Sequence, residues 1–140
     1  MKPFFTRTAP QAIGPYTQAI RTGNLLYCSG QTPIDPTTMK IESFTIEDQT
    51  RRAIQNLDAV LNEARLSLSD VVKTNVYLTD MADFTKMNSI YMECFGSHRP
   101  VRTTVSVKGL PHNALVEIEC IAEFKNKPSS LIYSLYARIK

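Results

Sequence analysis

The chain has 140 residues, of which 43% are hydrophobic, and its formal net charge is +3. This length and apolar content predict one ordinary domain with a substantial core. The basic residues are interleaved with acidic ones and form no contiguous stripe with aromatic residues. A nucleic acid is therefore not the expected partner.

The cysteines and the N-terminus bear on the cellular compartment. Cys28, Cys94 and Cys120 are odd in number, have no C-x-x-C spacing, and each lies in an apolar stretch. Reduced, buried thiols of this kind are typical of cytoplasmic proteins. The N-terminus has no hydrophobic signal core, and no apolar run approaches a membrane span. We expect a soluble cytoplasmic domain without a membrane partner.

The first forty residues predict a short edge strand or arm, then a hairpin, then a loop. Residues 18–21 and 25–30 flank Thr22-Gly23-Asn24, which is typical of a hairpin turn. The second of these strands ends in Ser29-Gly30. Glycine there favours either a simple turn or the close approach of a backbone or a ligand. Residues 31–40 are rich in proline and threonine, so they predict a loop.

Two helices are predicted in the middle of the chain. Residues 46–64 carry apolar side chains at helical spacing, and Thr45 followed by Asp48 resembles a capping box. Residues 81–95 predict a second helix with Asp80 as its cap. Its apolar stripe consists of Phe84, Met87, Tyr91 and Phe95. Asn88 falls on the same stripe, where a buried amide either holds a loop or faces a site.

A strand is predicted between the helices, and two more follow the second helix. Residues 71–79 alternate in polarity, which places Val72, Thr74, Val76 and Leu78 on one face. Near the C-terminus, residues 101–107 and 115–120 alternate in the same way. Pairing across a turn near residues 109–110 would set Arg102 beside Glu117. Such a pair could bind and process a small acid, or it could be an ordinary cross-strand ion pair.

The predicted order of hairpin, helix, strand, helix and hairpin indicates an α+β fold. An antiparallel or mixed sheet would have two helices packed on one face. The opposite face would be free for oligomerisation, and we expect a homo-oligomer. The residues on that face that are apolar enough to need a neighbour are Thr103, Val105, Leu115 and Ile121.

Several familiar chemistries lack a motif in this sequence. His98 and His112 are the only histidines, and neither has a partner at metal-ligand spacing, so no metal site is expected. The chain contains no G-x-G-x-x-G, Walker or G-x-S-x-G motif, and no cysteine stands in an electropositive turn beside a histidine. Arg102 and Glu117 remain as the candidates.

An ordered series of short motifs resembles the RidA (YjgF) family of reactive-intermediate deaminases over residues 7 to 125. The C-terminal signature is carried by Pro100-Val101-Arg102-Thr103-Thr104-Val105, then Leu110-Pro111 and Val116-Glu117-Ile118-Glu119. The upstream matches are Ala9-Pro10, Ala12-Ile13-Gly14-Pro15-Tyr16, Ser29-Gly30-Gln31, Gln55-Asn56-Leu57, Asp70-Val71-Val72-Lys73 and Asp83-Phe84 with Asn88 and Tyr91.

The resemblance implies a chorismate-mutase-like fold that assembles as a homotrimer, with sites between subunits. It also implies cofactor-independent hydrolysis of 2-imino acids, or their enamine tautomers, to 2-keto acids and ammonia. By position, Arg102 would hold the substrate carboxylate and Glu117 would position or activate water. The Thr104 backbone would contact the imine nitrogen or the product oxygen. Gly30 would allow close backbone approach, and Tyr16 and Asn88 would line the pocket.

The sequence departs from the family pattern at several positions. Thr104 stands where the family often has cysteine, so any thiol-dependent regulation would be absent. Met39 replaces a common loop glycine, and Asn75 is assigned no role. Relatives usually end soon after the last strand. We therefore predict a single domain over residues 1–125 and a marginally ordered extension over residues 126–140.

Two functions of different classes remain open. The first is an imine or enamine deaminase, for example acting on 2-aminoacrylate and 2-aminocrotonate. The second is a non-catalytic ligand-sensing or regulatory protein on the same trimeric fold, because one fold hosts many functions. RNA cleavage, an older association of such proteins, has no independent support in this composition.

Overall fold

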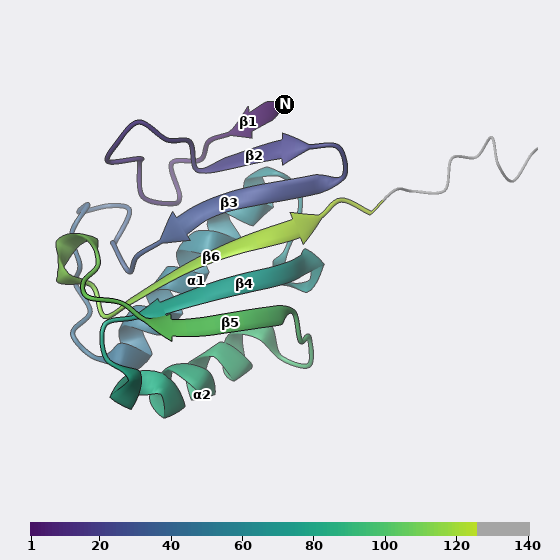
Figure 1. Cartoon of the computed structure of the whole chain (residues 1–140). Helices are drawn as coiled ribbons and strands as arrows, with labels where there is room; N and C mark the ends of the chain where they lie inside the picture. The colour runs from purple at the N-terminus through teal and green to yellow at the C-terminus, as the bar shows by residue number, and fades with distance from the viewer. Residues whose placement is uncertain (126–140) are drawn as a thin grey trace, which may run out of the picture.

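The computed structural model describes residues 1–125, and within them six strands form one mixed sheet (Figure 1). The strands are β1 (Lys2–Phe4), β2 (Ala19–Thr22), β3 (Leu25–Gln31), β4 (Val71–Leu78), β5 (Val101–Ser106) and β6 (Val116–Glu123). Their order across the sheet is β1-β2-β3-β6-β4-β5. Neighbours pair antiparallel except β4 and β5, which are parallel.

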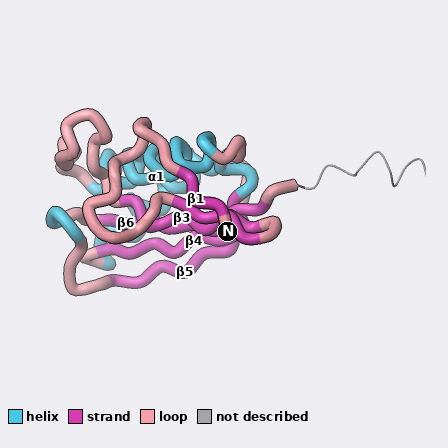
Figure 2. The backbone as a smooth tube through the Cα atoms, turned by 90° about the horizontal axis from the view of Figure 1, so that it is seen from above, coloured by secondary structure: helices cyan, strands magenta, loops and turns pink. Residues whose placement is uncertain are grey.

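Two α-helices, α1 (Ile46–Glu63) and α2 (Phe84–Phe95), cover one face of the sheet (Figure 2). The apolar side of α1 meets β3 and β6, where Leu57, Leu26 and Ile118 are fully buried. At the start of α1, Oγ1 of Thr45 accepts a hydrogen bond from the Asp48 backbone, so Thr45 is the predicted N-cap. The α+β class and the helix-covered face are thus confirmed.

The N-terminal hairpin also forms as predicted. β2 and β3 are joined at Gly23, whose φ of 57° lies in the left-handed region that glycine adopts without strain. Residues 32–40 form the predicted loop, although Gln31 still belongs to β3. Two hydrogen bonds from buried Asn56 hold this loop to α1. The Asn56 amide donates to the carbonyl oxygens of Thr32 at 3.1 Å and Ile34 at 2.8 Å.

The predicted C-terminal hairpin is wrong. β5 pairs with β4 alone, whereas β6 lies between β3 and β4 and is separated from β5 by a whole strand. The apolar face of β6 has four buried side chains. Such a face is fully covered when the strand lies in the middle of the sheet, which is why β6 is not an edge strand. β5 turns Arg102 and Thr104 toward the helices, which suits a half-exposed edge. Arg102 and Glu117 are therefore not cross-strand neighbours.

Two further predictions need correction. Val72 is 44% exposed because a register shift between Val71 and Lys73 turns Val71 inward in its place. Thr74, Val76 and Leu78 face the core as expected. On α2 the side chain of Asn88 is exposed and Phe84 is 36% exposed, whereas Ile90 is buried, so the buried stripe is shifted from the predicted one.

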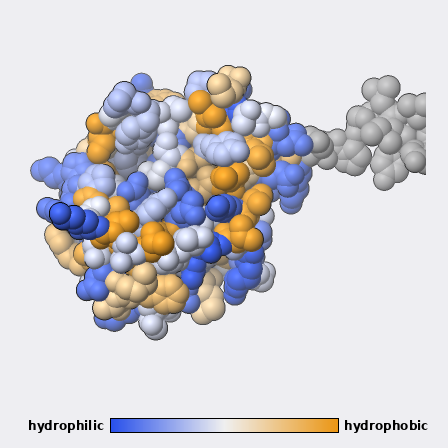
Figure 3. Space-filling model, viewed as in Figure 1, coloured by the Kyte–Doolittle hydropathy of each residue, from blue (hydrophilic) through white to orange (hydrophobic). Residues whose placement is uncertain are grey.

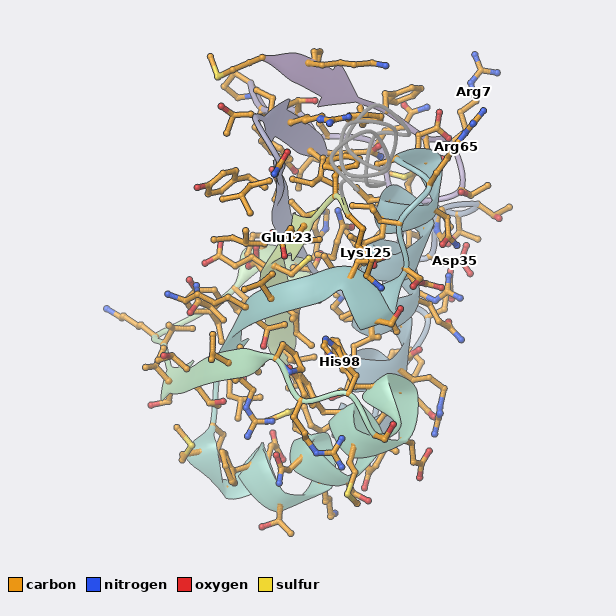
Figure 4. The ribbon with its side chains drawn as sticks, turned by 90° about the vertical axis from the view of Figure 1, so that its right-hand side faces the viewer. Arg7, Asp35, Arg65, His98, Glu123 and Lys125 are labelled. Carbon is orange, nitrogen blue, oxygen red and sulfur yellow. The ribbon has the colours of Figure 1, made fainter. Side chains whose placement is uncertain are left out.

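The connection from α2 into β5 is fixed at one end of the sheet. Nε2 of His98 donates a hydrogen bond to the Val71 carbonyl oxygen at 2.7 Å. Figure 4 views this end and shows His98 between the strands and α2, near Lys125 and Glu123.

No helix within residues 1–125 is long and apolar enough to cross a membrane. The extension predicted for residues 126–140 lies outside the described residues.

Candidate functional site

The six predicted site residues fall into two groups on different faces of the sheet. Arg102 and Thr104 point toward the helix-covered side, since they pair in register with buried Thr74 and Val76 of β4. Glu117 pairs with Tyr77 of β4 and points to the open face. One copy of the chain thus presents two separate hollows, here named the arginine half, with Asn88, and the glutamate half, with Tyr16 and Gly30.

The arginine half is a hollow of about 390 Å³ between α2 and the edge strand β5. Two arginines contribute to it, which makes it suited to an anion. Its lining residues are Asn88, Tyr91, Met92, Arg99, Pro100 and Arg102. Asn88 therefore lines this hollow, and its amide is exposed and not buried in the helix stripe. Its contact with a substrate stays a prediction.

Aromatic rings hold the Arg102 guanidinium. Its central carbon lies 4.7 Å from the centroid of the Tyr91 ring and 5.7 Å from that of Phe84. The Tyr91 hydroxyl is in turn hydrogen-bonded to Oγ1 of buried Thr74 at 2.7 Å. Among the described residues Arg102 forms no ion pair. Its charge is thus positioned by stacking and remains available for a ligand carboxylate.

Thr104 is two residues beyond Arg102 on the same side of β5. Its hydroxyl oxygen is buried and has no hydrogen-bond partner among the described residues. A buried hydroxyl without a partner is unfavourable by about 1–3 kcal/mol, which is why such groups mark places that receive a ligand or water. Thr104 is not part of the hollow's lining, so its predicted backbone contact with substrate stays a prediction.

The glutamate half forms where β3 and β6 meet. Glu117 lies against Gly30, and a Cβ added to Gly30 would be 2.2 Å from Oε1 of Glu117. The group that approaches Gly30 closely in this copy is thus the glutamate side chain, and the approach of a backbone or a ligand stays a prediction. Burial raises the pKa of Glu117, and the nearby charge of Glu119 raises it further. A carboxyl group of this kind is suited to taking up and releasing a proton.

Tyr16 closes the glutamate half from the N-terminal loop. It lines a hollow of about 350 Å³ together with Gly30 and Glu117. Two side chains that the motif comparison left without a role hold this loop. The Gln18 amide donates to the carbonyl oxygens of Thr6 and Pro10 at 3.0 and 2.8 Å, and the Ser29 hydroxyl donates to the Thr17 carbonyl oxygen at 2.6 Å.

A polar cluster beside Glu117 was not predicted. Oε1 of Glu119 accepts hydrogen bonds from the Tyr77 hydroxyl at 2.5 Å and from the Asn75 amide at 2.9 Å. The signal was present in the sequence, because Asn75 and Tyr77 alternate with the core-facing residues of β4 and so share the open face with Glu119. Sequence pattern could not show that β4 and β6 are neighbours.

The open face around this cluster is of mixed polarity, with hydrophobic patches between polar side chains (Figure 3). Tyr27 is 44% exposed and Val105 is 40% exposed.

No group of three or more histidine, cysteine, aspartate or glutamate side chains within residues 1–125 is arranged to hold a metal ion. The chemistry available is thus anion binding in one half and proton transfer in the other.

Comparisons with known proteins identify the family of this chain. The model of the family described as Endoribonuclease L-PSP matches residues 6–124. The chain belongs to the RidA/YjgF family. The predicted family resemblance is thereby confirmed, and with it the fold that the family shares.

Individual relatives support the same assignment. A RutC family protein of Pyrococcus horikoshii is 52% identical over 118 residues, which are 84% of this chain and 94% of that protein. Reactive Intermediate Deaminase A of Arabidopsis thaliana, a chloroplastic protein, is 44% identical over 117 residues, covering 84% of this chain and 63% of its own length. The structure of E. coli TdcF with bound serine superimposes with a TM-score of 0.86 at 38% identity, covering 89% of this chain and all of that one.

Proposed function

We propose that this RidA/YjgF family member hydrolyses 2-imino acids, or their enamine tautomers, to 2-keto acids and ammonia without a cofactor. The observation that carries the proposal is the pair of complementary half-sites: a stacked arginine without an ion-pair partner among residues 1–125, and a half-buried glutamate in a hollow. An imino acid offers a carboxylate for the first and an electrophilic carbon for the second. The small amino acid bound to TdcF has the same carboxylate and carbon skeleton as the three-carbon imine.

The two half-sites lie on opposite faces, so one chain cannot hold one small substrate in both. We therefore propose that the arginine half of one copy meets the glutamate half of a second copy. The exposed Tyr27 and Val105 of the open face would be covered by that contact. The homotrimer implied by the family resemblance provides such contacts three times around a closed ring.

The reaction then needs little beyond positioning. The Arg102 fork would hold the substrate carboxylate with two charge-assisted hydrogen bonds. Water attached to Glu117 would add its oxygen to the carbon of the protonated imine, while Glu117 takes the proton. Glu117 would return that proton to nitrogen. As the carbon–nitrogen bond breaks and ammonia leaves, the ionised Glu117 would take the remaining hydroxyl proton, the carbonyl would form, and Glu117 would pass this proton to the departing ammonia. A protonated imine is already electrophilic, so proximity supplies much of the acceleration.

Mixing two inactive variants tests the shared site. Arg102→Ala and Glu117→Gln chains would each be assayed with 2-aminoacrylate released by a serine dehydratase, and then as co-assembled hybrids. Each variant alone should be inactive. Random hybrids should recover about one quarter of the wild-type rate, because that share of interfaces in a closed ring combines two intact halves.

The controls separate the possible failures. A chain carrying both substitutions, co-assembled with Arg102→Ala, should recover nothing, because no interface is then intact. Inactive hybrids of folded, oligomeric variants would refute the shared site. Unchanged turnover in Arg102→Ala would refute the role of Arg102. A wild-type protein that binds small 2-keto acids yet never accelerates imine hydrolysis would support the ligand-sensing alternative.

A further inference from the structure

Glu119 and Glu117 are two carboxylates on one face of β6, and their surroundings differ. Both line the hollow of the glutamate half. Alternation along the strand sets their backbones about 7 Å apart. Glu119 is hydrogen-bonded through Oε1 to Tyr77 and Asn75, whereas Glu117 lies against the Gly30 backbone. Two adjacent acids in unlike environments divide their roles between a fixed charge and a proton carrier.

The donors to Glu119 are neutral, so they hold its charge without cancelling it. The hydrogen bond to Glu119, burial and the two nearby carboxylates raise the pKa of Tyr77 to about 12. Tyr77 therefore stays protonated at neutral and acidic pH. Asn75 carries no charge at any pH. Within the described part of the chain Glu119 has no ion-pair partner. Among the described residues of the same copy, no cation therefore neutralises its negative charge at the hollow.

The groups that face Glu117 come from each element around it. Tyr16 and Gly30 face it from the N-terminal loop and β3, Tyr77 from β4, and Glu119 from β6. No lysine, arginine or histidine of the same copy lines this hollow within residues 1–125. Among the described residues of the same copy, Glu119 is thus the one anion that lines the hollow with Glu117, and no cation there opposes it.

We propose that Glu119, held by Tyr77 and Asn75, is a positioning residue that keeps Glu117 as the proton carrier of the site. The inference rests on the proposed function, since it assigns the protonation of the same site. Glu119 touches no reacting atom in this scheme. It acts by disfavouring a second negative charge on Glu117, so that Glu117 takes a proton from water more readily than a lone surface glutamate.

The acidic limb of the rate–pH profile tests the proposal. The active form of Glu117 is ionised, so the rate falls as Glu117 becomes protonated. In Glu119→Gln that protonation should occur at lower pH. One pH unit below the wild-type midpoint, the variant should keep about two- to sixfold more of its plateau rate, as expected for removing a like charge at this distance. Glu119→Asp retains the charge and should restore the wild-type limb.

A measurement without turnover separates this inference from the proposed function. Carbon-13 NMR of labelled glutamate side chains, with the Glu117 signal assigned through Glu117→Gln, follows Glu117 directly in wild type and in Glu119→Gln. A lower titration midpoint in the variant supports the inference even if the protein hydrolyses no imine. An unchanged midpoint and an unchanged acidic limb would overturn it even if the protein is a deaminase. Should Glu119→Gln fail to fold, Glu119→Ala removes the same charge and should lower the titration midpoint of Glu117 in the same direction.

Discussion

Gly30 and Glu117 are in such close contact that any side chain at position 30 would displace the Glu117 carboxylate. A Cβ there would lie 2.2 Å from Oε1 and 2.9 Å from the carboxyl carbon of Glu117. The contacting atoms belong to the end of a flexible side chain, so a larger residue would rotate the carboxylate away rather than break the fold. The glycine at the end of β3 thus sets the position of the candidate catalytic acid.

Gly30→Ala should therefore lose activity while remaining folded. We expect kcat/KM to fall about 100-fold, because a displacement of about 1 Å is enough for such a loss. Stability should change by less than about 1 kcal/mol, since the glutamate can turn into solvent. Steady-state kinetics and thermal unfolding measure the two effects. Gly109→Ala is the matched control and should be silent, because a Cβ at Gly109 meets nothing within 4 Å.

The hydrogen bond between Tyr91 and Thr74 should stabilise the fold behind Arg102. Tyr91→Phe keeps the ring under the guanidinium and leaves the Thr74 hydroxyl, which is fully buried, without its partner. We expect a loss of about 1–2 kcal/mol in the free energy of unfolding. In a cycle with Thr74→Val, the double variant should lose less than the sum of the two single losses. Strictly additive losses in urea unfolding would contradict a direct bond.

Glu117 should lower the stability of the protein at neutral pH. Its pKa is raised in the folded state by burial and then by Glu119, so folding favours the protonated form. The stabilisation from that form is complete below the unfolded pKa of about 4.3 and is lost as pH rises through the folded value. Glu117→Gln should thus gain stability at pH 7, by less than about 1 kcal/mol because the half-exposed group is screened by solvent.

The same comparison carried out at pH 4 provides the check. There wild-type Glu117 is largely protonated, so the advantage of Glu117→Gln should shrink toward zero. Chemical denaturation at the two pH values measures the difference. Glu42→Gln changes an exposed acid in a loop and should show no such pH-dependent gain. An advantage of Glu117→Gln that grew at pH 4 would contradict the sign of the argument.

Met39 is strained in the loop before α1. Its φ of 57° lies in the left-handed region, which costs a residue with a Cβ about 1–2 kcal/mol. Met39→Gly should relieve this strain. Glycine also loses more conformational entropy on folding, which offsets part of this relief. The free energy of unfolding should therefore rise by about 0.5 kcal/mol, and activity should be unchanged. A higher urea midpoint at a constant slope would show it. Lys40→Gly, at a neighbouring position without a positive φ, should give no gain.

Local pattern was a reliable guide wherever a single element determines the outcome. The helix over residues 46–64, its Thr45 cap and the Gly23 turn were predictable because periodicity, capping and glycine geometry act within a few residues. Val72 was placed on the wrong face because a bulge shifts the alternation by one residue, and a bulge has no clear mark in sequence. Asn88 was placed on the buried stripe because helical spacing cannot show where the partner surface ends.

The sequence by itself indicated the family and the residue types of the site, because the ordered motifs up to Glu119 are recognisable from residue types and their spacing along the chain. What only the tertiary structure decided is which of them meet. Arg102 and Glu117 are close in sequence, yet the crossover through α2 makes β5 parallel to β4, and β6 enters between β3 and β4. Strand order depends on long-range pairing and burial, which no local spacing encodes. The register of β5 and β6 against β4 places the arginine and the glutamate on opposite faces, and the strand order brings Glu119 to Tyr77 and Asn75.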